Sequence, residues 1–108
     1  MNQNEQPRTA AEVTPQLIEA WKKQNPAGVF RMTVGDKVGY CRTPNRMDLK
    51  YAMTRMQTGG PLEMAEAIFE ETWLGGDAEI QEVDEYFLGA LSQMQELLKV
   101  QTAALEKL

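Results

Sequence analysis

The chain has 108 residues, 43% of them hydrophobic, and its 11 basic and 16 acidic side chains give a formal net charge of −5 without any histidine. This length and hydrophobic share suffice for one modest core, so we expect a single domain. The negative charge disfavours nucleic acid as a partner, and the lack of histidine removes the usual proton shuttle of an enzyme.

The single cysteine, Cys41, cannot form an internal disulfide, and the first residues show no signal-peptide pattern. No run of apolar residues approaches the roughly 20 needed to cross a bilayer. We therefore expect a cytoplasmic protein that does not contact a membrane.

The N-terminal segment is polar and lacks a sustained apolar period. Residues 1–13 are therefore expected to form a flexible tail, followed by a single α+β domain over residues 14–108. Thr14 and Pro15 together are a helix-start signal, and the short helix that follows places Trp21 on its apolar side.

Residues 29–42 have β-rich spacing on both sides of Gly35 and Asp36, which suit the two-residue turn of an antiparallel hairpin. A loop of that length places Phe30 opposite Cys41. Because a lone hairpin is marginal in water, one face must pack on helices, and an open edge is available to a strand of another chain.

Helical spacing returns after Pro44 and is interrupted by Gly59 and Gly60, before Pro61 opens a second helix. This second helix carries one apolar stripe that we expect to be buried. The stripe comprises Leu62, Ala65, Ile68, Phe69 and Trp73.

The segment Trp73–Asp77 contains a large aromatic residue, two glycines and an aspartate, and it could form either a functional site or a corner between two helices. Gly75 and Gly76 favour a corner, because paired glycines supply the left-handed conformation that ends helices. The acidic residues that follow lack the spacing of a calcium loop and would repel phosphate. The sequence therefore predicts no catalytic residue, no metal and no cofactor.

From Asp84 to Leu108 the sequence predicts one long terminal helix, with Gly89 as its one weak position. Its apolar surface exceeds what a small monomer needs, so we expect it to meet a protein partner or a second copy of the chain. The apolar seam comprises Phe87, Leu91, Met94, Leu98, Leu105 and Leu108.

Seven methionines are many for this length, and such adaptable side chains either fill a core or line a binding groove. Both readings stay open. If there is a groove, its predicted lining is Met53, Met56, Phe87, Leu91, Met94 and Leu98, with Leu105 and Leu108 as further partner contacts.

The order of the segments "YCRTPNR", "GPLEMAEAIFEETWLGGDAEI" and "DEYFLGAL" resembles small proteins of tailed bacteriophages and prophages, some of them tail assembly chaperones. The elements above predict a two-stranded hairpin followed by a small helical body of three to four helices that ends in a long C-terminal helix. The resemblance implies the same order, in which a strand hairpin leads through a proline-containing turn to a helical body. It also implies a non-enzymatic protein that shields apolar segments of a tape-measure protein in the bacterial cytoplasm. The alternative is a structural head–tail or tail component that stays in the virion.

Overall fold

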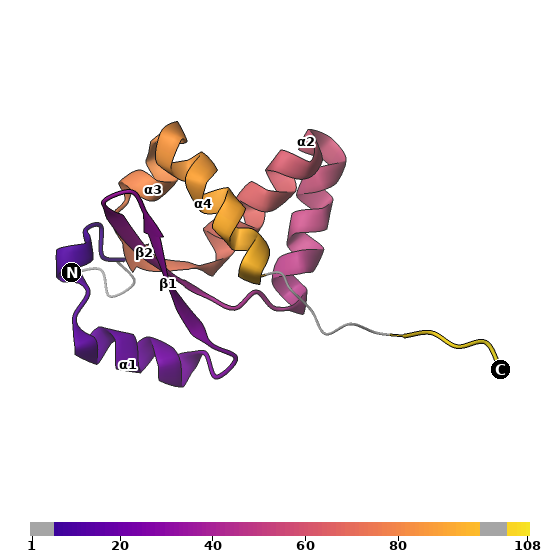
Figure 1. Ribbon diagram of the computed structural model, residues 1–108, viewed down its shortest axis with the longest axis horizontal. Coiled ribbons are helices and arrows are strands. Elements are labelled where there is room, and N and C mark those ends of the chain that lie inside the picture. The colour runs from indigo at the N-terminus through magenta and orange to yellow at the C-terminus, as the bar shows by residue number, and fades with distance from the viewer. Residues whose placement is uncertain (1–5, 98–103) are drawn as a thin grey trace.

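The computed structural model describes residues 6–97 and 104–108, and it has a mixed α+β fold (Figure 1). The antiparallel sheet has three strands in the order β1-β2-β3, with helices around it. The α+β class is confirmed, but the sheet has one strand more than the expected hairpin. The elements are η1 (Ala10–Glu12), α1 (Pro15–Gln24), β1 (Val29–Val34), β2 (Lys37–Arg42), α2 (Arg46–Thr72), β3 (Trp73–Gly76), α3 (Glu79–Glu82) and α4 (Asp84–Leu97).

Helix α1 begins as the sequence predicts. The Thr14 side chain accepts a hydrogen bond from the Leu17 N–H group at 3.1 Å, which satisfies one of the free donors of the first turn. Trp21 is buried, and its ring centroid lies 5.6 Å from that of Tyr40 in β2. The helix therefore contacts the sheet through Trp21, the one buried residue of α1.

The β1–β2 hairpin has the predicted register, with Phe30 opposite Cys41 and Gly35 and Asp36 in the turn. The sheet face that holds Cys41 and Met32 is buried against the helices. The core extends from there through Phe69 in α2 and on to α3 and α4. This arrangement confirms the expectation that one face of the hairpin packs against helices.

The expected helix corner at Gly75 and Gly76 is wrong, because these residues belong to strand β3, which pairs with β2. Gly76 has a φ of +125°, and a Cβ atom there would lie 2.5 Å from the Val38 carbonyl oxygen. Gly76 therefore allows β3 to approach β2 closely, and the two glycines do not form the end of a helix. The burial predicted for Trp73 is confirmed, since the residue is 6% exposed.

Helix α2 turns back on itself at Gly60, whose φ of +83° is not helical. The two halves correspond to the two helices expected on either side of this break. Arg55 joins them, because its guanidinium contacts Glu63 at 2.6 Å, Glu66 at 3.4 Å and Glu70 at 3.3 Å in the second half. The carboxylates raise the pKa of Arg55 further above its ordinary value.

Helix α4 is shorter in the described residues than the sequence predicts. It is assigned from Asp84 to Leu97, whereas residues 104–108 have no regular secondary structure, and they lie away from the body (Figure 1). The expectation of helix as far as Leu108 is therefore wrong at its end. Residues 104–108 lie outside the core, and Leu105 and Leu108 are fully exposed, so no buried face supports a helix over these residues. Leu98 lies outside the described residues.

Residues 6–13 lie against β3 and the turn that follows it. The expectation of a flexible tail over residues 1–13 concerns motion and stays a prediction. What the structure adds is a set of specific hydrogen bonds, among them one from the Gly76 N–H group to the Pro7 carbonyl oxygen at 3.2 Å.

Candidate functional site

An apolar groove lies between the second half of α2 and α4, with a volume of about 430 Å³. Ile68 and Met94 are buried in the core at its base, whereas Leu62 at its rim is 57% exposed. The full lining is Pro61, Leu62, Met64, Ala65, Ile68, Leu91 and Met94. A groove of this size and character can hold apolar side chains of a partner.

The break in α2 shapes this groove. Pro61 follows Gly60 directly and starts the second half of the helix in a new direction, so that Leu62 and Met64 come to face α4. Leu62 was expected to be buried with the rest of its stripe, and this expectation is wrong. It lies in the first turn after the break, where α4 leaves one side of the helix open.

Two of the residues predicted to bind a partner, Leu91 and Met94, line the groove. Phe87 packs against the core instead, with its ring centroid 5.7 Å from that of Phe69. Met53 and Met56 are exposed on the first half of α2 and are not among the lining residues.

Among the described residues, this groove therefore gathers only part of the predicted set. Leu105 and Leu108 are fully exposed, while Leu98 lies outside the described residues. Any binding role of these residues and of the two exposed methionines stays a prediction.

Sequence reasoning missed Pro61, Leu62, Met64 and Ala65 as groove residues. The signal was present in the run Gly59-Gly60-Pro61, which marks a sharp reversal between two apolar helices. A reversal of this kind exposes the first turn of the second helix unless another element covers it.

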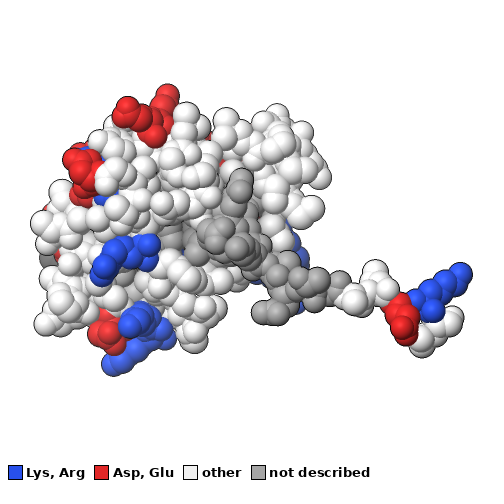
Figure 2. Space-filling view, viewed as in Figure 1, with Lys and Arg blue, Asp and Glu red and all other residues white. Residues whose placement is uncertain are grey.

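Charged side chains are unevenly distributed over the face of the molecule that Figure 2 shows. In the view of Figure 2, charged side chains gather over α1 and α3, and the surface over α2 is mostly uncharged. Near α2, the pKa of Glu66 is raised, chiefly by burial and then by the neighbouring carboxylates of Glu63 and Glu70.

A cluster of polar side chains around Arg42, the last residue of β2, connects the sheet to α2. Arg42 donates two hydrogen bonds to the Asp48 carboxylate, at 2.6 and 2.8 Å, and a third to the Glu71 carbonyl oxygen. Hydrogen bonding to Arg42 lowers the pKa of Asp48, despite the opposing effect of burial. This cluster joins β2 to both ends of α2.

Cys41 is fully buried in β2, and burial raises the pKa of its thiol to about 12. The thiol is therefore protonated at neutral pH, and a structural role in the core fits it better than a nucleophilic one.

The acidic run after β3 is used for local contacts. Both Asp77 carboxylate oxygens accept backbone hydrogen bonds, Glu79 pairs with Lys37 at 3.5 Å, and Glu82 pairs with Arg8. Within residues 6–97 and 104–108, no group of three or more histidine, cysteine or acidic side chains is arranged to hold a metal ion.

No helix among the described residues is both long enough and apolar enough to span a membrane. Comparisons of the chain with protein-family models, with curated proteins and with solved structures found no match. The groove must therefore be interpreted from its own chemistry.

Proposed function

We propose that this chain is a phage-derived, non-enzymatic binding protein of the tail-assembly-chaperone type, which acts in the cytoplasm of the bacterial host. Its α2–α4 groove shields an apolar helical segment of a tape-measure protein until the tail tube forms around it. The observation that carries the proposal is the open apolar groove of about 430 Å³, with Leu62 exposed at its rim.

The chemistry of the groove fits an amphipathic helix as ligand. Apolar side chains of two helices form its walls, so a third helix can complete a three-helix contact by placing its apolar stripe between them. Met64 and Met94 are unbranched and adapt to stripes of different shape. The net charge of −5 keeps such a protein soluble while it carries an apolar client.

The decisive experiment measures the affinity of labelled peptides that contain amphipathic helices from the tape-measure protein. We expect Leu62→Gln to weaken capture about tenfold, since one leucine loses its apolar contact with the client. Met47→Gln is the matched control, because Met47 is 68% exposed but lies outside the groove. Equal losses for both variants, or no capture by the wild-type chain, would contradict the proposal.

A second candidate function is a structural tail or head–tail component that remains in the virion. The observation in its favour is that β1 is an edge strand whose Phe30, Arg31 and Thr33 are exposed, so a neighbour's strand can add to the sheet. Mass spectrometry of purified particles separates the two functions, because a chaperone leaves the finished particle and a structural component stays.

A further inference from the structure

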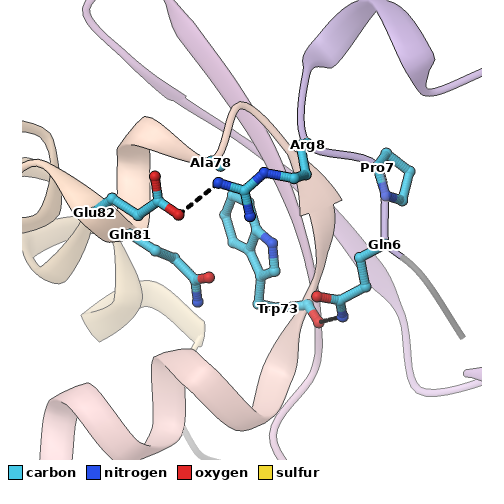
Figure 3. Close-up of a pocket in the computed structure, with 7 residues that line it drawn as sticks. All are labelled: Gln6, Pro7, Arg8, Trp73, Ala78, Gln81 and Glu82. Atoms are coloured by element: carbon cyan, nitrogen blue, oxygen red, sulfur yellow. Dashed lines mark hydrogen bonds and ion pairs between the residues drawn. The ribbon is translucent and has the colours of Figure 1, made fainter.

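The N-terminal residues 6–10 run along the outer edge of β3, on the side opposite β2 (Figure 3). Gln6 donates a side-chain hydrogen bond to the Trp73 carbonyl oxygen at 3.0 Å. The Gly76 N–H group donates to the Pro7 carbonyl oxygen at 3.2 Å. Main-chain groups of an edge strand are thus satisfied by an extended segment from the far end of the chain.

The contacts continue past the end of β3. The Ala78 N–H group donates to the Arg8 carbonyl oxygen at 3.0 Å. The Asp77 carboxylate accepts from the Ala10 N–H group with one oxygen and from the Val38 N–H group with the other, each at 2.8 Å. Asp77 therefore ties the N-terminal segment to β2 through charge-assisted hydrogen bonds.

Side chains of the segment are recognised as well as its backbone. Arg8 forms an ion pair with Glu82 at 2.6 Å, across a pocket of about 280 Å³ beside Trp73 (Figure 3). The Pro7 ring lies over Gly75, where an added Cβ atom would come within 2.8 Å of it. The stretch from Trp73 to Glu82 thus forms a docking site for an extended Gln-Pro-Arg-Thr-Ala segment.

Little apolar surface holds the segment in place. Gln6, Arg8 and Thr9 are exposed, and both side chains of the Arg8–Glu82 pair are more than half exposed. The short helix η1 follows the segment, contacts β2 and β3 and moves with it, and the link from η1 to α1 consists of Val13 and Thr14, both in extended conformation. A segment held mainly by polar contacts and joined by a short extended link can leave its own site without disturbing the core.

We propose that this docking site also binds residues 6–10 of a second copy of the chain, so that two copies exchange their N-terminal segments. Every contact of the docked segment is reproduced between the copies, because both carry the same segment and the same site. Only the link at Val13 and Thr14 changes its path. The inference concerns a surface separate from the α2–α4 groove and does not depend on the proposed function.

Charge-swapped full-length chains test this exchange. Arg8→Glu places like charges at the site both within one copy and between identical copies, and so does Glu82→Arg. When the two variants are mixed, an exchanged heterodimer restores an opposite-charge pair at both sites. We expect sedimentation velocity to show at least about fivefold more dimer in the mixture than in either variant alone. The control is the double variant, which restores the pair within one copy and should behave as wild type.

A second measurement weakens the chain's own segment and leaves the site intact. Ala10→Pro removes the N–H group that donates to Asp77, and the extended Thr9 that precedes it accommodates a proline. A labelled peptide of residues 1–13 should bind this full-length variant about tenfold more tightly than wild type, because its internal competitor is weaker. Ala10→Ser keeps the N–H group and serves as the control.

The results separate three situations. More dimer in the mixture together with peptide binding supports exchange between copies. Peptide binding without dimer in the mixture overturns the second-copy assignment, because the site then accepts a free segment but two copies do not exchange theirs. If the mixture shows no additional dimer and the peptide does not bind, the proposal is overturned, since the segment then docks only within its own chain.

Discussion

The junction where α2 meets β3 at Trp73 and the α2–α4 groove lie at opposite ends of the apolar stripe that runs from Leu62 to Trp73. The junction is filled by residues of the chain itself, whereas the groove is left open. At the junction, Trp73 fills the core, and the backbone groups around Gly76 and Asp77 are hydrogen-bonded within the molecule. At the groove, apolar side chains from two helices leave about 430 Å³ open between them. Exposure along this one stripe rises from 6% at Trp73 to 57% at Leu62.

This difference separates stability from binding. A change at the closed junction removes contacts that exist only in the folded chain, so it should lower the free energy of unfolding. A change at the open groove removes surface that water already reaches, so it should affect a ligand more than the fold. The variants below test this separation, from the largest expected loss of stability to the smallest.

Trp73→Ala should have the largest effect. The indole packs edge-to-face on Phe69 with ring centroids 5.5 Å apart, and it covers Gly39, where a Cβ atom would lie 2.4 Å from the ring. Emptying this space should lower the free energy of unfolding by about 3–5 kcal/mol, measured by chemical denaturation. An unchanged denaturation midpoint would show that Trp73 does not support the core.

Asp48→Asn should come next, because it breaks the pair that joins β2 to α2. The amide offers Arg42 one acceptor in place of two, and the guanidinium is largely buried. We expect a loss of about 1.5–3 kcal/mol at neutral pH. Asp84→Asn, at an exposed carboxylate, is the control and should change the stability little.

The same pair predicts a pH dependence. The pKa of Asp48 is lower in the folded chain than its ordinary value of 3.8, so the unfolded chain binds the proton more readily. The stabilisation is present above pH 3.8 and is lost as the pH falls below it through the folded pKa. Acid denaturation followed by circular dichroism should therefore be shallower in Asp48→Asn than in wild type. Identical acid profiles would show that other carboxylates dominate.

Two glycine substitutions compare a crowded and an open position. Gly76→Ala forces a side chain into a positive φ and against the Val38 carbonyl oxygen, whereas the Cβ of Gly60→Ala meets no atom within 4 Å. Backbone strain alone costs about 1–3 kcal/mol at such positions. Gly76→Ala should therefore lower the free energy of unfolding more than Gly60→Ala does, because it adds the steric clash with the Val38 carbonyl oxygen to this strain. Thermal unfolding of both variants checks the order, and a reversed order would contradict the role of Gly76 in strand approach.

Local features with strong chemical signals could be predicted from the sequence alone. The Thr14 cap, the turn at Gly35 and Asp36 and the burial of Trp73 each depend on neighbouring residues or on one large side chain. The hairpin register followed from the loop length alone, because a two-residue loop leaves one pairing.

Features that depend on distant contacts could not be predicted in this way. A Gly-Gly pair after a helix has the same local preference whether it ends the helix or joins a sheet, and at Gly75 and Gly76 the pairing with β2 decides the outcome. The groove residue Leu62 matched the period of a buried stripe, but its exposure depends on where α4 lies. Periodicity finds an apolar face and cannot say what covers it.

Leu62→Gln should have the smallest effect on stability and thereby completes the comparison. The residue is 57% exposed in the first turn after Gly60, so the substitution should change the free energy of unfolding by no more than about 0.5 kcal/mol. A dye that fluoresces in apolar sites should bind the native wild-type groove and bind this variant less, while Met47→Gln, at an exposed residue outside the groove, leaves the signal unchanged. If Leu62→Gln instead destabilised the chain as strongly as Trp73→Ala, Leu62 would belong to the core, and the groove would not be an open surface. A stable variant with reduced dye binding would show that the apolar surface of Leu62 contributes to ligand binding and not to the stability of the fold.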